Sequence, residues 1–214
     1  MNTFSKPLAC IALCAGIFAA GCKKEPLNNL SNEETRIYVT QVDSSARFQG
    51  YKTFSIADSA DIIEDNQFLG RQLGPYESGL IAQLSQSLQQ RGYTLVPKAS
   101  NPDLAVNVSE VSNTSTGLFS YSDYWDNYGL YYDPYYWGYP GYGYYPPTFI
   151  GSYSIESGGL EVDILDLKNA AANGNKLKLL WSGLERGEDI FNPANAPAEA
   201  KALLEQSSYI KATN

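Results

Sequence analysis

The acidic residues best suited to chemistry lie in one short stretch of alternating polarity. Residues 159–167 read GLEVDILDL, so Glu161 and Asp163 are two positions apart, and Asp166 follows where the alternation breaks. In an extended strand the first two side chains point to the same face, with Cβ atoms about 7 Å apart. Such a pair could form the carboxyl groups of a glycoside hydrolase or bind calcium. The alternative, which the alternation favours, is a solvated strand face opposite a buried apolar face.

The chain contains no histidine, which removes many kinds of catalysis. Histidine is the commonest general base near neutral pH and a frequent metal ligand. All three cysteines, Cys10, Cys14 and Cys22, lie in the first 22 residues. A chain cleaved before Cys22 therefore has no catalytic thiolate and no cysteine–metal site. We predict no metal site and no cofactor, and we expect that the protein is not an enzyme.

The N-terminal residues have the order of a secretion signal followed by a lipid anchor. An uncharged run, Pro7 to Ala20, follows Lys6 and is too short to span a bilayer as a helix. It ends in Ala19-Ala20-Gly21-Cys22, which is similar to the lipobox of bacterial lipoproteins. We predict that residues 1–21 are a signal peptide, that Cys22 is lipidated, and that residues 22–35 are a flexible tether. The alternatives are an ordinary secretory signal and a buried apolar helix.

Charge and sorting residues limit the location and the partners. The formal net charge is −8, and no cluster of basic residues follows Lys23-Lys24, so the chain lacks the electrostatic footprint of a nucleic-acid-binding protein. The run Cys22-Lys23-Lys24-Glu25 resembles the lysine-plus-acid sorting signal of lipoproteins in Bacteroidota. We therefore expect an outer-membrane protein anchored through the lipid at Cys22. Whether it faces the periplasm or the cell surface is left open.

Residues 119–150, here called the aromatic segment, hold a large share of the aromatic rings. Of the 17 tyrosines in the chain, most lie in this segment among glycines and prolines, so we predict a long loop without regular structure. One interpretation is a low-complexity insert without a ligand. The other is a glycan- or protein-binding surface of solvent-facing rings that can be deleted with little loss of stability. The candidate contact residues are Tyr121, Tyr124, Trp125, Tyr128, Tyr131, Tyr132, Tyr135, Tyr136, Trp137, Tyr139, Tyr142, Tyr144 and Tyr145.

The remaining pattern predicts an α+β domain over residues 36–214. Alternation indicates strands near residues 36–42, 51–56, 93–96, 103–111, 159–167 and 176–182. One helix should begin at Pro75 and end before Gly92, and another should follow Asn192 or Asn195. We therefore expect a mostly antiparallel sheet with two helices packed on it, plus the long loop. Trp181, followed by Ser182-Gly183, is interpreted as a core residue before a turn rather than as a stacking platform.

Several short runs together resemble one known family. They are Tyr51-Lys52-Thr53-Phe54, Arg91-Gly92-Tyr93, Asn101-Pro102-Asp103-Leu104-Ala105-Val106, residues 159–166 and Leu180-Trp181-Ser182-Gly183. In this order and spacing they resemble the bacterial envelope lipoproteins of domain-of-unknown-function family 4136, over residues 36–210. The resemblance implies a compact α/β lipoprotein domain with no assigned activity, so no catalytic residue can be transferred. The aromatic segment departs from the family pattern.

The sequence thus favours a membrane-anchored, non-enzymatic binding or structural module. Its partner would be a glycan or an envelope protein, and the aromatic segment would be the contact surface. The alternative is a carboxylate-based glycan hydrolase that uses Glu161 and Asp163. A pocket holding both carboxyl groups with raised pKa values would favour the enzyme, and exposed carboxylates would favour the module.

Overall fold

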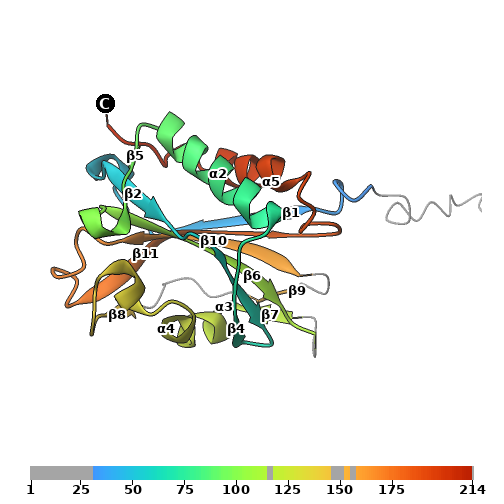
Figure 1. Cartoon of the computed structure of the whole chain (residues 1–214), viewed down its shortest axis with the longest axis horizontal. Helices are drawn as coiled ribbons and strands as arrows, with labels where there is room; N and C mark the ends of the chain where they lie inside the picture. The colour runs from blue at the N-terminus through green and yellow to red at the C-terminus, as the bar shows by residue number, and fades with distance from the viewer. Residues whose placement is uncertain (1–30, 115–117, 146–151, 155–157, 214) are drawn as a thin grey trace, which may run out of the picture. The chain divides into compact units, whose positions relative to one another are not determined.

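Strands with alternating apolar residues form a mixed sheet at the centre of the molecule (Figure 1). The computed structural model describes residues 31–114, 118–145, 152–154 and 158–213. Within these ranges the sheet has nine strands, and its main path contains six of them. Their order is β1 (Ile37–Val42), β11 (Lys176–Arg186), β10 (Gly159–Asp166), β6 (Leu104–Ser112), β2 (Thr53–Ile56) and β5 (Thr94–Leu95).

Most of the long pairings in this sheet are antiparallel, as the sequence predicts. β10 lies between β11 and β6 and is antiparallel to both, with Asp163 opposite Ser182 on one side and Asn107 on the other. The predicted hairpin of residues 159–167 and 176–182 is therefore confirmed. β2 instead runs parallel to β6 and to β5. The expected mostly antiparallel sheet is correct in outline, with parallel pairs that the alternation could not reveal.

Three further strands of this sheet lie off the main path. β3 (Ala60–Glu64) runs parallel to the second half of β6, and β4 (Gln67–Gln72) is antiparallel to β3. The turn between them places both Asp65 and Asn66 at positive φ, which tight hairpins require. β8 (Gly143–Tyr145) runs parallel to the start of β11. A separate two-stranded sheet pairs β7 (Leu118–Ser120) with β9 (Ser152–Ser154).

The two predicted helices are present and pack on one face of the sheet (Figure 1). α2 (Pro75–Gln90) begins at its proline, and Gly92 follows it at φ +92°. α5 (Ala196–Glu205) follows Asn195. Between the helices and the sheet lies a hydrophobic core in which Trp181 is fully buried and donates its Nε1–H to Ser207 Oγ at 2.9 Å. The interpretation of Trp181 as a core residue is therefore confirmed.

Gly183 shows why glycine follows the core tryptophan by two positions. A Cβ atom at this glycine would lie 2.4 Å from the Trp181 ring and 3.0 Å from Leu203 Cγ. Such a contact is far too short, so α5 can approach the sheet closely only because this position lacks a side chain. The residues after Trp181 thus continue β11 rather than forming the turn that the sequence suggested.

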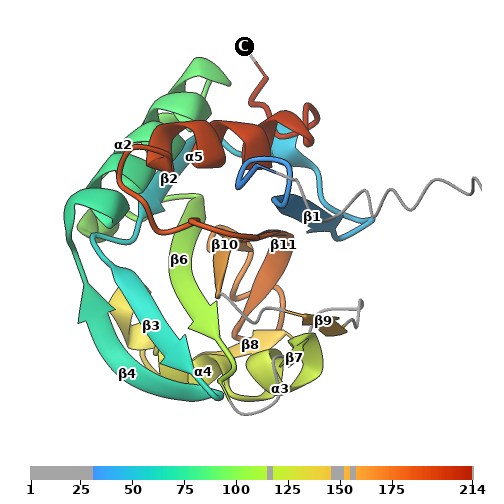
Figure 2. The same ribbon diagram turned by 90° about the vertical axis from the view of Figure 1, so that its right-hand side faces the viewer.

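The prediction of a long loop for the aromatic segment is wrong. Its described residues form α3 (Tyr121–Asp126), α4 (Tyr128–Tyr131), the 3-10 helix η3 (Pro134–Trp137) and β8, on the face of the sheet opposite α2 and α5 (Figure 2). The described residues therefore contain four α-helices rather than two, together with the further 3-10 helices η1 (Phe48–Gly50) and η2 (Lys98–Ser100).

Capping residues explain how so many glycines and prolines fit into this segment. Ser120 Oγ accepts a hydrogen bond from Asp123 N at the start of α3, and Asp133 Oδ1 accepts one from Tyr135 N at the start of η3. Pro134 occupies the first turn of η3, and Gly138 ends it at φ +85°. These residues mark the boundaries of short helices rather than an absence of structure.

The end of the predicted tether is folded onto the domain. Thr35 Oγ1 donates to Asn32 O at 2.6 Å and accepts from Glu188 N at 3.1 Å. The predicted flexible tether of residues 22–35 is therefore too long at its C-terminal end, because these hydrogen bonds fix residues 32–35. Residues 1–30, which include the predicted signal peptide and Cys22, lie outside the described residues. In the part of the chain that is described, no helix is both long and apolar enough to cross a membrane.

Candidate functional site

A second hydrophobic core lies between the aromatic segment and the sheet. The segment contributes rings that are 8% exposed or less, from Tyr124, Trp125, Tyr128, Tyr131, Tyr132 and Trp137. They pack on apolar residues of the sheet face opposite α2 and α5, including Ala105, Val111, Leu165 and Leu177. These six rings were expected to face solvent, and that expectation is wrong. Each aromatic ring buries a large apolar area, so the rings pack on the sheet rather than remain in water.

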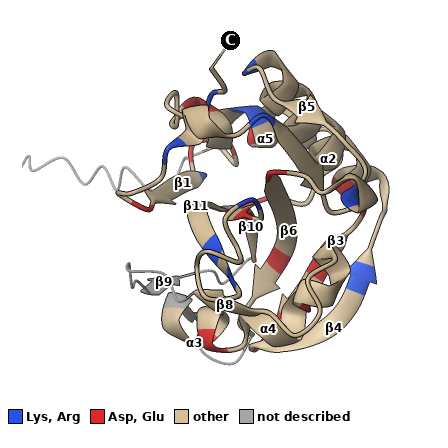
Figure 3. Cartoon of the chain, turned by 90° about the vertical axis from the view of Figure 1, so that its left-hand side faces the viewer, with Lys and Arg blue, Asp and Glu red and all other residues tan. Residues whose placement is uncertain are grey.

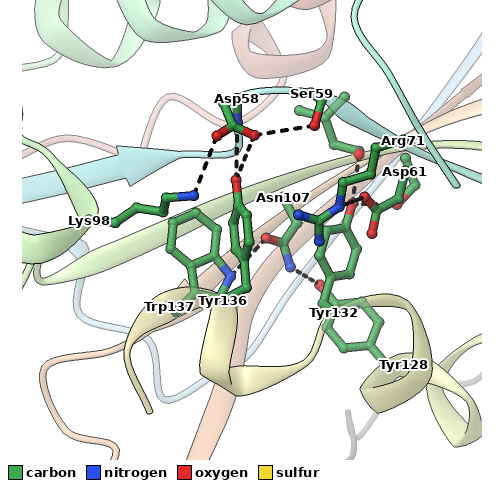
Figure 4. Close-up of polar contacts among 12 residues, drawn as sticks. Asp58, Ser59, Asp61, Arg71, Lys98, Asn107, Tyr128, Tyr132, Tyr136 and Trp137 are labelled. Atoms are coloured by element: carbon green, nitrogen blue, oxygen red, sulfur yellow. Dashed lines mark hydrogen bonds and ion pairs between the residues drawn. The ribbon is translucent and has the colours of Figure 1, made fainter. Parts of the chain in front are cut away.

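Polar atoms of this second core are joined in a network that begins at Asn107 of β6 (Figure 4). Its Nδ2 donates to the Tyr128 hydroxyl at 2.7 Å, and its Oδ1 accepts from Trp137 Nε1 at 3.1 Å. Tyr132 donates its hydroxyl to Val108 O at 2.6 Å and lies 2.8 Å from Ser109 Oγ. The buried hydroxyls of Tyr128 and Tyr132 thus have hydrogen-bond partners, as burial requires.

Glu161 and Asp163 are part of the same buried layer, so the prediction of a solvated strand face is wrong. Glu161 is 0% exposed and Asp163 is 1% exposed. Tyr124 donates its hydroxyl to Asp163 Oδ2 at 3.1 Å, and Ser182 Oγ donates to Glu161 Oε1. Burial raises the pKa of Asp163 to about 7. The carboxyl groups are covered by the aromatic segment, which the alternation in β10 alone could not indicate.

Asp166, the third acidic candidate, has a local structural role. It accepts hydrogen bonds from the Tyr51 hydroxyl at 2.9 Å and from Asn169 Nδ2 at 2.8 Å. These bonds fix the turn after β10 to the start of β2. Figure 3 shows acidic residues spread over many elements, including β6, β10 and α3, rather than gathered at one end of the sheet. Among the described residues no three His, Cys, Asp or Glu side chains could hold a metal ion together.

Only part of the predicted contact surface is available to a partner. Tyr135 is 71% exposed, Tyr145 is 46% exposed, and Leu130, which the sequence did not single out, is 73% exposed. Four further predicted rings are partly buried: Tyr136, Tyr139, Tyr142 and Tyr144. Nothing is described of the Tyr121 side chain. The candidate surface therefore reduces to the exposed residues of α4, η3 and β8.

Tyr136 attaches this surface to three other parts of the fold (Figure 4). Its ring lies between two cations, with Lys98 Nζ 3.4 Å and Arg71 Cζ 4.2 Å from the ring centre. Its hydroxyl donates to Asp58 Oδ1 at 3.0 Å, and Arg71 in turn forms an ion pair with Asp61 at 2.8 Å. Cation–π contacts of this kind stabilise ring positions at half-buried sites. The contacts of Tyr136 therefore fix the backbone of η3, which also carries the neighbouring Tyr135.

A separate buried acidic cluster lies where the chain enters the domain. Arg36 Nη2 lies 3.3 Å from Glu199 Oε1, and its Nε lies 3.9 Å from Glu185 Oε1. Tyr76 donates its hydroxyl to Glu199 at 2.8 Å. Burial raises the pKa of Glu185 to about 8 and that of Glu199 to about 7. Sequence reasoning missed this cluster because its members come from the residue before β1 and from α2, β11 and α5.

Comparisons with known proteins identify a family and a fold. The sequence model of the family described as "Domain of unknown function (DUF4136)" matches residues 38–207. A crystal structure of a DUF4136 family protein from Bacteroides thetaiotaomicron is similar, with a TM-score of 0.66 and 24% identity, covering 83% of this chain and 98% of that chain. A PelC dodecamer from Paraburkholderia phytofirmans gives a TM-score of 0.38 at 9% identity, covering 84% and 99% of the two chains. No curated protein matches.

Proposed function

The chain belongs to the DUF4136 family, and on that premise we propose that it is an outer-membrane lipoprotein whose folded domain is a non-enzymatic binding module. The lipid at Cys22 anchors the domain, and the exposed residues of the aromatic segment, Leu130, Tyr135 and Tyr145, form the contact surface. The partner is a glycan or an envelope protein.

The observation that carries this proposal is the exposure of large apolar side chains on a rigidly held segment. Leu130 and Tyr135 are each more than 70% exposed, although the rings next to them, Tyr131 and Trp137, are buried. Tyr136 holds the backbone beside Tyr135 through its contacts with Arg71, Lys98 and Asp58. A pre-organised surface loses little conformational entropy on binding, and exposed tyrosine is well suited to contact glycans and proteins.

Nothing in the structure favours the glycan hydrolase considered from the sequence. A hydrolase must bring both carboxyl groups against the glycosidic bond of a bound sugar. Glu161 and Asp163 are instead covered by the rings of the aromatic segment, with exposures of 0% and 1%. The raised pKa of Asp163 therefore follows from burial in a core.

The proposal is tested with a triple variant that removes the exposed side chains and leaves the buried ones. The full chain carrying Leu130→Ser, Tyr135→Ser and Tyr145→Ser is compared with the parent for retention of partners from solubilised outer membranes. Tyr209→Ser is the matched control, since Tyr209 is 38% exposed and lies outside the segment. We expect that the triple variant loses partners which the parent and the control retain. Equal retention by all three proteins contradicts the proposed surface.

A further inference from the structure

The Glu161 and Asp163 carboxyl groups occupy the centre of the sheet, on the face that the aromatic segment covers. Both come from β10, the strand between β6 and β11. Asn107 and Ser182 lie opposite Asp163 on the two neighbouring strands, and Ser109 lies opposite Glu161 on β6. The carboxyl groups are therefore surrounded by short polar side chains within the sheet and by tyrosine rings above it.

The groups that face Asp163 are hydroxyl groups and a second carboxyl group. From the aromatic segment these are the hydroxyls of Tyr124 and Tyr128, from β11 the hydroxyl of Ser182, and from β10 itself Glu161. From β6 the neutral side chains Asn107 and Ser109 complete the layer. None of these described partners of Asp163 is a lysine or arginine.

The nearby charges that act on the tyrosine hydroxyls do not supply a free cation. Tyr132 and Tyr144 of the segment experience the charge of Asp61 on β3 as well as that of Asp163. Asp61 is itself paired with Arg71, whose Nε lies 2.8 Å from Asp61 Oδ1. The layer around Asp163 thus contains acidic groups and hydroxyls. Arg71, the cation that acts on Tyr132, is already paired with Asp61.

Two neighbouring carboxylates in such a layer cannot both be ionised without a large free-energy cost. Burial disfavours the charged form of each, and like charges close together disfavour the second ionisation further. One proton is therefore retained by the pair in the folded protein. Burial is also the main reason that the pKa of Asp163 is raised to about 7. In an opened segment, water would reach the pair and both groups would ionise at ordinary carboxyl pKa values, near 4.

We propose that a proton shared by Glu161 and Asp163 holds the aromatic segment closed on the sheet, so that loss of this proton loosens the segment while the rest of the domain stays folded. The hydroxyls of Tyr124 and Tyr128 are hydrogen-bond partners of Asp163. The Tyr128 hydroxyl also accepts from Asn107, which lies opposite Asp163 on β6. Water can therefore hydrate a newly formed carboxylate only if these rings move away. The proposal concerns how the segment is attached and is independent of what its exposed rings bind.

The direction of the pH effect follows from linkage. The closed state binds the proton up to about pH 7, whereas the opened state releases it above about pH 4. The proton therefore stabilises the closed state most at low pH, and this contribution is lost as the pH rises to about 7, beyond which it levels off. For one proton, the equilibrium for opening changes by up to about tenfold per pH unit in that window.

Hydrogen exchange of the full chain at pH 5, 6 and 7, corrected for intrinsic exchange rates, tests the proposal. We expect that protection of amides in α3, α4 and η3 falls by up to about tenfold per pH unit. Amides of α2 should stay more protected than those of the segment at every pH, because they exchange only when the whole domain unfolds. Asp163→Asn keeps a hydrogen-bonding side chain without a titrating proton, so the slope of the segment should become flat. Glu185→Gln is the matched control, because it removes a buried carboxyl group from the other acidic cluster and should leave the slope of the segment unchanged.

Three results would overturn the proposal. The first is pH-independent protection of the segment in the parent protein, and the second is the same slope in Asp163→Asn as in the parent. The third is equal protection of α2 and of the segment at each pH, which would mean that both exchange by global unfolding rather than by local release of the segment. If Asp163→Asn lacks a folded far-UV circular dichroism spectrum, Glu161→Gln provides the same comparison, because it removes the other member of the pair.

Discussion

Trp137 donates its indole N–H to Oδ1 of Asn107 at 3.1 Å, across 30 residues of sequence. The indole is 2% exposed and the amide is fully buried. This bond joins η3 to the central strand β6 and makes the aromatic segment part of the core.

Truncation of Trp137 should therefore be costly, in contrast to truncation of an exposed ring nearby. We predict that Trp137→Ala lowers the free energy of unfolding by about 3–5 kcal/mol, because it removes a large buried ring and leaves Asn107 without one partner. Tyr135→Ala, at a side chain that is 71% exposed, should change it by less than about 0.5 kcal/mol. Urea denaturation of both variants gives the two values, and similar losses would contradict this account of the core.

Replacement of residues 119–150 by a short Gly-Ser linker should prevent folding or make the protein insoluble. The linker would expose the sheet face that the aromatic segment covers. On this face Leu165 and Leu177 are 0% exposed in the intact protein, and Glu161 is buried. Loop closure changes the free energy only slightly, whereas the loss of several buried rings costs roughly 1.5–3 kcal/mol for each. Expression and thermal melting decide the matter: a soluble deletion variant with a nearly unchanged melting temperature would show that the second core is dispensable.

Local sequence patterns predict well the strands and helices that form the core between the sheet and helices α2 and α5. The alternation of apolar residues located β10 and the start of β11, and Pro75 and Gly92 bounded α2. The residues of these elements that pack in the core beneath α2 and α5 are apolar and recur with the period of a strand or a helix, so that period reports the structure directly. The same reasoning missed β3 and β4, because that hairpin begins and ends within a stretch of mixed polarity.

The second core could not be predicted from such patterns. Asn107 and Ser109 on β6, and Glu161 and Asp163 on β10, are polar residues that normally face water, yet all four are buried. Their burial depends on hydroxyl partners such as Tyr128, Tyr132 and Tyr124, which lie 15–39 residues away in sequence. The clue available in the sequence was the number of rings in the aromatic segment, which is too much apolar surface to leave in water.

Buried carboxyl groups elsewhere should make the whole domain less stable as the pH rises. Burial, together with a hydrogen bond to Glu77, raises the pKa of Glu110 to about 8, and burial raises the pKa of Glu185 to about 8. Each acid binds a proton in the folded state that it releases on unfolding, so the stability it contributes is full below about pH 4 and is lost as the pH rises to about 8. We predict that the urea midpoint falls steadily between pH 5.5 and pH 8.

The contribution of Glu110 can be isolated by substitution. Glu110→Gln should flatten the dependence of the unfolding free energy on pH, by up to about 1.4 kcal/mol per pH unit for one proton. Glu205→Gln, at a surface side chain that is 62% exposed, is the control and should keep the parent slope. A midpoint that rises with pH in the parent, or an unchanged slope in Glu110→Gln, would contradict the predicted sign.

Lipidation is the prediction on which the location depends. The full chain carrying Cys22→Ser should lose metabolic labelling by a fatty-acid probe and accumulate as unprocessed precursor, because the thioether to the lipid can no longer form. Proteinase K treatment of intact cells then reports which membrane face the domain occupies. If the variant keeps the fatty-acid label and the gel mobility of the parent, Cys22 is not the site of lipid attachment.

The central claim is that exposed side chains of the aromatic segment contact a partner in the cell envelope, and site-specific photo-crosslinking in living cells tests it most directly. A photoreactive residue replaces Tyr135 in one strain and Tyr209 in another, since both side chains are exposed but only the first belongs to the segment. We predict a discrete crosslinked product from position 135 and none from position 209. The absence of a product at position 135, or the same product at both positions, would contradict the claim.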